Sequence, residues 1–507
     1  MAWIIFSIFT LVVFSQNYPH LVTGTRNFKT WFSQEPLPAK LLLVLMAVGA
    51  GVILLCAFYA SLLPPHLDQE FDALNYHLSL PRQHLLRGSF SLIPWSSADL
   101  YFLPIDFALA PFWLATSLPN KLPQFFFVLG LLGVGGCLAR RFSNGKIWPS
   151  VLLVLAVLGS HNIGIQLGTA MLDIVICYLF LAAFDSFLSG AIWLGVVELT
   201  FYIWSKPLIP VQFVATLIVF GLVWLFLWVW GIRKNIWVTS GEKISEFTAY
   251  TRYAFKKGFI LFLVLSFFVA GPFIFKSLRF SGTPLFPLGV GMFRTLSISQ
   301  SPERWVELKL KATQLLATKD QYGSGRNLLE FGRHFWLIAV PEKGVNNRYD
   351  YPLGLMYLLF LGPFLFYFLS SLRQKILPLL SLWAIVSWGI WWFGTQQSRF
   401  LFIPLILMYL AVVPSIRAPS RILLGAMLCA ILLTSISVYG ANKHDLGRWG
   451  EAVLRHQDKE LIRLGKIQQS ASRITLPFYD VAYATFPVEA VDKDSLFVLK
   501  TVPGPNK

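Results

Sequence analysis

Long apolar stretches, separated by short polar connections, recur along most of the chain. About 20 apolar residues in a helix are needed to cross a hydrocarbon core roughly 30 Å thick, so these stretches predict transmembrane helices. Their apolar character is continuous rather than alternating, which favours helices over the strands of a barrel. We therefore predict an all-α polytopic membrane protein. The expected spans, about 12 in number, are 1–15, 39–63, 122–139, 147–160, 171–188, 190–204, 207–231, 257–276, 351–371, 376–394, 399–415 and 420–439.

The Lys and Arg residues between the spans predict the orientation, because cytoplasmic loops of membrane proteins are enriched in both. Threading the chain through all the spans puts every basic cluster on one side, which we expect to be the cytoplasm. These clusters are Arg26/Lys29, Arg140/Arg141/Lys146, Arg233/Lys234/Lys243, Arg373/Lys375 and Arg417/Arg421. The N-terminus then lies outside, unless residues 1–15 do not span.

The same threading divides the chain into a transmembrane domain, 1–439, and a small extramembrane tail, 440–507. It leaves outer loops at about 64–121 and 277–350. In the first loop, residues 68–88 have helical periodicity with one apolar and one polar side, as expected for a helix lying in the interface plane. Pro81 either kinks this helix or starts a second one.

Composition agrees with a membrane protein, since only 13% of the 507 residues are charged and soluble domains usually have about 25%. The net charge of +17 would suggest nucleic-acid binding in a soluble protein. Here the basic residues lie mainly in short loops, so much of the excess is expected from membrane topology, and we expect no nucleic-acid partner. The remainder favours anionic lipids or a phosphate-bearing substrate.

Three acidic residues are candidates for chemistry at the outer surface: Asp72, Asp106 and Asp173. Asp72 has Tyr76 one turn on and His77 nearby. A carboxylate at a membrane boundary acts as a general base or ligates a divalent cation, and otherwise is simply solvated. Asp173 begins an apolar run and Asp106 follows Pro104. Each faces a cavity or a partner, or else is a first-turn carboxylate favoured by the helix dipole.

Three basic residues lie at outer span ends, against the positive-inside trend: Lys206, Arg279 and Arg399. Taken alone, each fits a snorkelling or anchoring side chain. Together with the nearby acids they indicate a site for an anionic, lipid-linked substrate. The zinc-protease pattern H-E-x-x-H, the C-x-x-C pair and the Walker motif are absent from the sequence.

Four short motifs resemble those of the GT-C glycosyltransferases, polytopic enzymes that use polyprenyl-phosphate sugars. The family includes the family 39 protein mannosyltransferases and the aminoarabinose transferases of lipid A. The first outer loop of the family is similar to FDALNYHLSLPRQHLLRG, in which Asp72, Tyr76, His77 and Gly88 match its pattern. An acid that enters a later span is matched by Asp173 in GTAMLDIVICYLF.

The other two motifs follow in the family's order. The loop G-N-P-x-F-P resembles SGTPLFPLG, with Thr283 where Asn is common, and a late span opened by an Arg resembles QQSRFLFIPLILMYL. Asp106 stands where related sequences often have Glu. The resemblance extends from about residue 60 to 415.

The resemblance implies a multi-pass enzyme at the outer face of a bacterial plasma membrane. It implies transfer of a sugar from a polyprenyl-phosphate donor to a hydroxyl of a glycan, lipid or protein acceptor. Asp72 and Asp173 are then the candidate catalytic residues, and they also form the candidate site for a divalent ion such as Mg or Mn. The candidate substrate-binding residues are Tyr76, His77, Asp106, Lys206, Arg279 and Arg399.

Two alternatives remain open from the sequence. One is a transporter or flippase of lipid-linked saccharides, which usually needs polar residues at the bilayer midplane and often internal repeats. The other is an O-antigen polymerase or ligase, whose long outer loop carries essential Arg and His. Arg304, Arg333 and His334 are candidates for those roles.

Overall fold

The computed structural model is almost entirely helical over the residues that it describes. These are 27–62, 72–93, 96–101, 103–114, 121–206, 208–229, 236–239, 242–298, 302–317, 322–340, 349–374, 377–416 and 418–454, with two-residue strands at 476–477 and 491–492. The expected span 1–15 and most of the tail 440–507 therefore lie outside the described residues.

Six helices in the described part are long and apolar enough to cross a membrane. They are Leu37–Ser61 (α2), Leu122–Phe142 (α5), Gly258–Ser281 within α11 (Ile244–Ser281), Leu355–Arg373 (α14), Ser398–Ser415 around α16 (Phe402–Val412), and Arg421–Asn442 within α17 (Arg421–Leu454). A multi-pass membrane protein is thereby confirmed.

The remaining expected spans overlap five further helices. These are Ile147–Gly159 (α6), Asp173–Leu188 (α8), Ile192–Ile203 (α9), Leu208–Val229 (α10) and Leu379–Phe393 (α15). Every expected span inside the described part thus coincides with a helix. The all-α class is confirmed, but the number of about 12 spans is not, because six of these eleven helices reach the length and hydropathy of a full crossing over their described residues.

The helix α16 forms the centre of the bundle. Of the six long spans in the described part, Ser398–Ser415 is 78% buried, whereas the other five are 17–44% buried. It contacts α6, α8, α14 and α15, so protein rather than lipid covers most of its surface. Its apolar side chains therefore form the core.

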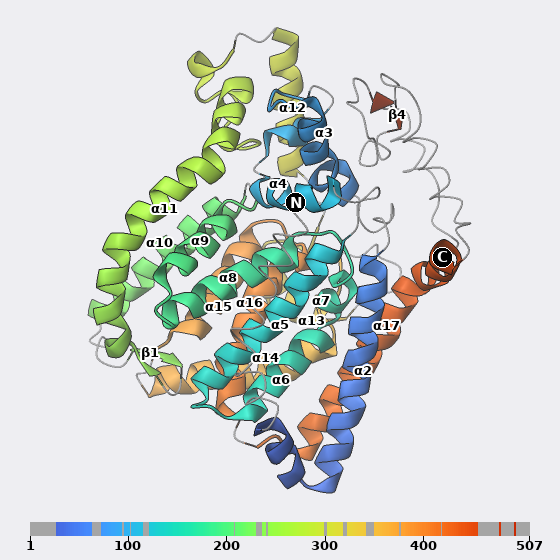
Figure 1. Cartoon of the computed structure of the whole chain (residues 1–507). Helices are drawn as coiled ribbons and strands as arrows, with labels where there is room; N and C mark the ends of the chain where they lie inside the picture. The colour runs from blue at the N-terminus through green and yellow to red at the C-terminus, as the bar shows by residue number, and fades with distance from the viewer. Residues whose placement is uncertain are drawn as a thin grey trace.

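A second packing unit joins α2 and α17, which run side by side at the edge of the bundle (Figure 1). Ser435 donates a hydrogen bond of 2.9 Å to the carbonyl of Gly49. A Cβ at position 49 would lie 2.7 Å from a methyl carbon of Ile431, so this close approach requires glycine. α17 continues without a break to Leu454, and the expected last span and the start of the tail belong to one helix.

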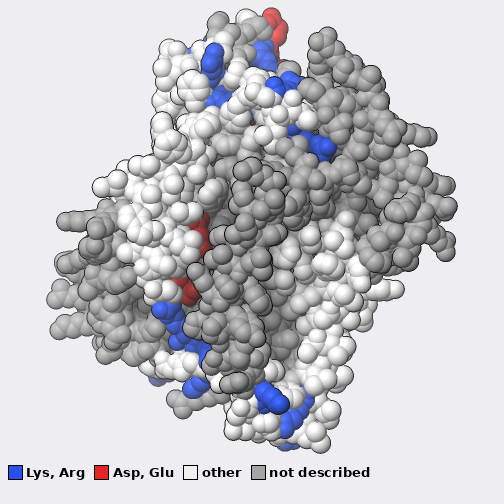
Figure 2. All heavy atoms as spheres, viewed as in Figure 1, with Lys and Arg blue, Asp and Glu red and all other residues white. Residues whose placement is uncertain are grey.

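Outer-loop helices cover one end of the bundle: α3 (Ser79–Arg87), α4 (Pro104–Leu114) and α12 (Pro302–Ala317) (Figure 1). Near the other end, β1 (Ile236–Thr239) pairs antiparallel with β2 (Glu242–Lys243) and parallel with β3 (Leu377–Pro378). Figure 2 shows Lys and Arg gathered at the two ends of this face. The described surface between them is mostly uncharged, as expected for a bundle that spans a bilayer.

The first outer loop does not form the exposed interfacial helix that the pattern at 68–88 predicts. Its described part is a π-helical turn, η1 (Ala73–His77), followed by α3, so Pro81 lies in the first turn of a second helix. Ser79 and Gln83, expected on a water-facing side, are 1% and 0% exposed. The amphipathic pattern misleads here because the polar side also packs against protein.

A buried polar cluster explains how that polar side is covered. The Nε2 of His84 on α3 lies 2.6 Å from Asp99 in η2 (Ser97–Leu100), and Lys276 on α11 donates to the same carboxylate oxygen across 2.7 Å. All three side chains are nearly inaccessible. Buried charges require such partners. Here the contacts among His84, Asp99 and Lys276 join the first outer loop to α11.

Candidate active site

Two ion pairs bring together four residues that are far apart in the sequence. The guanidinium of Arg399 donates to the Asp72 carboxylate across 2.9 Å. The Nζ of Lys206 donates to the Asp173 carboxylate across 2.7 Å. All four side chains are at most 20% exposed. The structure therefore gathers four of the eight candidate site residues at one place.

Helix ends position these side chains. Asp173 is the first residue of α8, where the helix dipole stabilises a carboxylate. Lys206 lies three residues beyond the end of α9, and Arg399 is in the 3₁₀ turn η6 (Ser398–Leu401) that opens α16. Asp72 immediately precedes η1. Asp72, Asp173 and Arg399 are at the N-terminal ends of their elements, and Lys206 follows the C-terminal end of α9, so the bundle brings all four to one side.

Asp350 is a third carboxylate beside Arg399, and the sequence motifs do not include it. Its Oδ2 lies 3.6 Å from the Nε of Arg399. The adjacent backbone is tied to Ser398, whose N–H donates to the Tyr349 carbonyl across 2.8 Å. Asp350 has a positive φ of 78°, which sequence patterns rarely reveal for a residue other than glycine.

The two acids beside Arg399 differ in their protonation. Burial raises the pKa of Asp72, but the charges of Arg399, His77 and Lys206 outweigh burial and lower that pKa below its usual value. Burial raises the pKa of Asp350 to about 6. The Arg399 charge opposes this rise only in part, and the charges of Asp173 and Asp72 add to it. Asp72 is therefore ionised at neutral pH, and Asp350 titrates just below it.

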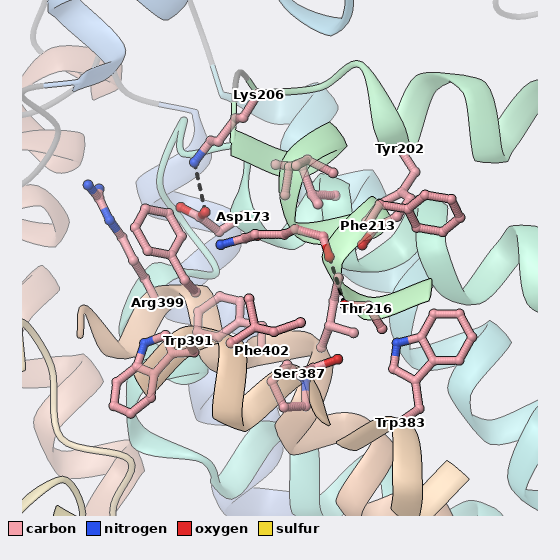
Figure 3. Close-up of a pocket in the computed structure, with 17 residues that line it drawn as sticks. Asp173, Tyr202, Lys206, Phe213, Thr216, Trp383, Ser387, Trp391, Arg399 and Phe402 are labelled. Atoms are coloured by element: carbon pink, nitrogen blue, oxygen red, sulfur yellow. Dashed lines mark hydrogen bonds and ion pairs between the residues drawn. The ribbon is translucent and has the colours of Figure 1, made fainter. Parts of the chain in front are cut away.

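A narrow cleft extends from these charges into the bundle. Its open volume is about 70 Å³, and Asp173, Lys206 and Arg399 form its charged end. Figure 3 shows these three side chains together, with aromatic and apolar side chains around the remainder. The apolar and aromatic lining residues include Tyr202, Phe213, Trp383, Trp391, Phe400, Phe402 and Ile403. The lining is thus amphipathic, with a charged end and an apolar body.

Comparison with known proteins identifies the fold. No family model matches the sequence, and no curated protein matches it. ArnT from Cupriavidus metallidurans bound to undecaprenyl phosphate superposes with a TM-score of 0.51 at 14% identity, over 91% of this chain and 87% of ArnT. The same ArnT in the apo state gives 0.51 at 13% identity, over 90% and 87%. ArnT is an aminoarabinose transferase of the GT-C superfamily. The chain has the GT-C fold.

The apo oligosaccharyltransferase of Archaeoglobus fulgidus, also a GT-C protein, is similar at 11% identity with a TM-score of 0.45, over 90% of this chain and 65% of its own. At 13–14% identity the similarity to ArnT establishes the fold alone. The GT-C resemblance inferred from the motifs is thereby confirmed for the architecture.

His77 and Asp106 form a buried pair behind Asp72. The Nδ1 of His77 lies 3.0 and 3.1 Å from the two carboxylate oxygens of Asp106. Burial raises the pKa of Asp106, while the His77 contact lowers it. His77 is 1% exposed and Asp106 is 0% exposed, so in this GT-C fold the pair braces η1 and does not line the cleft.

Tyr76 lies close to the ion pairs, within electrostatic range of Asp72 and Arg399. Its ring packs edge-on against Tyr101, with ring centroids 5.7 Å apart. Burial raises the pKa of Tyr76, and the Asp72 charge raises it further, so the phenol stays protonated and is available as a donor.

Arg279 does not join the other candidates. It is exposed near the end of α11, and it is absent from the lining of the cleft. Its backbone carbonyl accepts the N–H of Ile298 across 2.8 Å. Arg279 therefore helps to shape the loop that follows α11, and its expected contact with substrate stays a prediction.

The expected divalent metal has no support from the side chains present. In the part of the chain that the structure describes, no three His, Cys, Asp or Glu side chains are grouped as metal ligands. Asp72 and Asp173, the expected ligands, are each engaged by a cation instead.

Proposed function

We propose that this protein is a GT-C glycosyltransferase that transfers a sugar from a polyprenyl-phosphate donor to an acceptor hydroxyl at the outer face of the plasma membrane. The observation that carries the proposal is the amphipathic cleft. Lys206 and Arg399 offer positive charge at the end where Asp72 lies, and aromatic side chains continue into the bundle. Such a lining suits a ligand with an anionic headgroup and a long apolar tail.

The geometry supports a specific division of roles. Asp72, ionised at neutral pH, accepts the proton of the acceptor hydroxyl as that oxygen attacks the anomeric carbon of the sugar. The bond between this carbon and the phosphate oxygen breaks, and the polyprenyl phosphate leaves with the bonding electron pair. Lys206 and Arg399 stabilise the negative charge that develops on the phosphate. Attack opposite to the leaving group inverts the anomeric configuration.

The carboxylates now paired with the two cations have a further consequence for donor binding. Asp173 forms an ion pair with Lys206, while Asp72 and Asp350 lie beside Arg399. Because the open volume between them is small, a phosphate has to displace these contacts to reach the cations. The release of Asp72 from Arg399 would increase its basicity at the moment the donor is bound.

The alternative of an O-antigen polymerase or ligase receives less support. The candidate His334 is 0% exposed, its Nδ1 contacts the Phe331 carbonyl, and its Nε2 accepts a hydrogen bond of 2.9 Å from Trp388. Burial lowers the pKa of His334 to about 4, so it is neutral. Arg304 and Arg333 each pair with a glutamate on their own helix. The transporter alternative gains no support from the cleft, whose charges lie at one end.

The test compares wild type with Asp72→Asn, purified in detergent and supplied with membrane-extracted polyprenyl-phosphate sugars and candidate acceptors. Glu307→Gln, which removes an exposed carboxylate of the outer loop, is the matched control. We expect release of polyprenyl phosphate by wild type and control, and a loss of about 10²–10⁴-fold in the Asp72 variant. Equal release by folded Asp72→Asn would refute the assigned base. Absence of release from wild type across donors and acceptors, with uptake of the same lipids into vesicles, would replace the transferase with a transporter.

A further inference from the structure

A second cavity lies at the opposite end of α16 from the cleft. It has an open volume of about 550 Å³, within the range of ligand sites in proteins. It is formed by the C-terminal half of α14, the 3₁₀ turn η7 (Val413–Ser415) after α16, and the start of α17. Arg373 and Arg421 lie at this end, which the positive-inside trend predicts to be cytoplasmic, so we place the cavity in the inner leaflet of the bilayer.

We propose that this cavity binds the headgroup of an anionic phospholipid from the cytoplasmic leaflet. This site is separate from the proposed sugar transfer, and nothing in the argument for it depends on that reaction. The residues that line the cavity are uncharged, and Arg373 and Arg421 lie at the ends of two helices that form it, where basic side chains attract such headgroups.

The polar lining supplies neutral hydrogen-bond donors. Ser370, Ser371 and Gln374 come from the end of α14, and Ser415, whose hydroxyl now donates to the Val412 carbonyl across 2.6 Å, comes from η7. Hydroxyl and amide groups donate to phosphate oxygens without requiring a counter-charge. They lie on two segments, α14 and η7, and line one volume, so a headgroup in the cavity would contact polar groups from both at once.

The charge around the cavity favours an anion. Arg373 at the end of α14 and Arg421 at the start of α17 are both exposed. The sequence contains no Asp or Glu from residue 351 to residue 444, the segment that supplies every lining residue. No acidic side chain of this segment therefore competes with a bound phosphate for the arginines.

The apolar surroundings distinguish a lipid from a free ion. Phe366 is 75% exposed and Leu369 is 62% exposed on α14, and Ile422 on α17 is 85% exposed. Phe366 also lines the cavity, together with Pro363 and Leu423. Acyl chains that extend from a headgroup in the cavity would lie along this apolar surface.

The experiment measures lipid retention by the full chain in a neutral detergent, using native mass spectrometry. The probes are dioleoyl-phosphatidylglycerol, dioleoyl-phosphatidylcholine and inorganic phosphate. Arg373→Gln combined with Arg421→Gln removes the charge, and Ser370→Leu fills the cavity while keeping both arginines. Arg304→Gln combined with Arg333→Gln removes the same charge from the outer loop and is the matched control.

We expect wild type to retain phosphatidylglycerol in preference to phosphatidylcholine. The inner double variant should bind it about tenfold or more weakly, because each cation near the surface contributes about a fivefold factor. Ser370→Leu should lose most of the preference, and the outer control should keep it. Equal retention of the two lipids, or an unchanged preference in both inner variants, would overturn the proposal. Displacement of phosphatidylglycerol by millimolar phosphate would identify a free-anion site and overturn it as well.

Discussion

The guanidinium of Arg399 donates a hydrogen bond of 2.9 Å to the carboxylate of Asp72, a residue 327 positions earlier in the chain. This contact links the first outer loop to the central helix of the bundle. It holds a candidate base and a candidate phosphate ligand in one arrangement before any substrate arrives. The predictions below follow from this contact and from its neighbours.

The first prediction concerns the shape of the Arg399 side chain. Its Nη1 contacts Asp72, its Nε lies toward Asp350, and its Nη2 lies 3.5 Å from the Gln397 side chain. Lys supplies the charge but not this planar fork. We expect Arg399→Gln to lower kcat/KM by about 10²–10³-fold, and Arg399→Lys to recover only part of that loss. Full activity in a folded Arg399→Lys enzyme would show that charge alone matters.

The second prediction concerns the Lys206–Asp173 pair. If Lys206 stabilises the leaving phosphate, Lys206→Gln should lower kcat/KM by about 10²-fold or more. Lys206→Gln leaves the Asp173 carboxylate without its partner. Adding Asp173→Asn removes that unpaired charge, but it should not restore activity. Steady-state kinetics on the two single variants and the double variant measure this, with the exposed Lys309→Gln as control. Recovery in the double variant would mean that the pair acts only structurally.

The third prediction concerns pH. Below a pH of about 6 Asp350 is protonated and neutral, and above it an additional anion lies 3.6 Å from the Nε of Arg399. A donor phosphodiester carries a constant charge in this range, so it meets more competition for Arg399 as the pH rises. We expect the KM for the donor to increase as the pH rises from about 5 to 7.

The matching variant is Asp350→Asn, which keeps the side chain neutral throughout. Its KM for the donor should vary little over the same range and should resemble that of wild type at low pH. A KM profile that is identical in wild type and variant would assign the pH dependence to another group.

The fourth prediction separates stability from chemistry at Asp106. Because its buried contact with His77 would be broken, Asp106→Ala should lower the free energy of unfolding by about 3–5 kcal/mol. Asp106→Asn keeps an acceptor for the imidazole and should be milder. Unfolding in detergent and activity per folded molecule are measured together. A folded Asp106→Asn protein without transferase activity would give Asp106 a direct role at the substrate instead.

The sequence predicts the membrane architecture well because lipid exposure imposes a simple rule on composition. It also brings Asp72, Asp173, Lys206 and Arg399 to one place, since all four are adjacent to outer span ends. Sidedness alone therefore locates charged residues along the membrane normal. It does not locate them within the membrane plane, and Arg279, expected on the same side, is exposed and does not line the cleft.

The remaining differences depend on tertiary packing. His77 and Asp106 appear available for substrate in the sequence, but each covers the other in the interior. Asp350 has no motif around it, and its place beside Arg399 depends on a positive φ and on hydrogen bonds to Ser398. Polar periodicity at 68–88 predicts a solvated face, and it cannot signal that His84 will be buried against Asp99 and Lys276.

The burial of α16 has a consequence for how the protein is made. This helix is near the end of the chain, yet α6, α8, α14 and α15 all pack against it. Helices inserted earlier during synthesis therefore wait in the bilayer with their future contact surfaces exposed to lipid or to one another. Neither the core nor the Arg399–Asp72 contact can form until the ribosome has passed residue 412. Chains that stop before α16 should keep the pairs that α5, α6, α8 and α9 form with one another but lack the buried centre that joins them to α14 and α15.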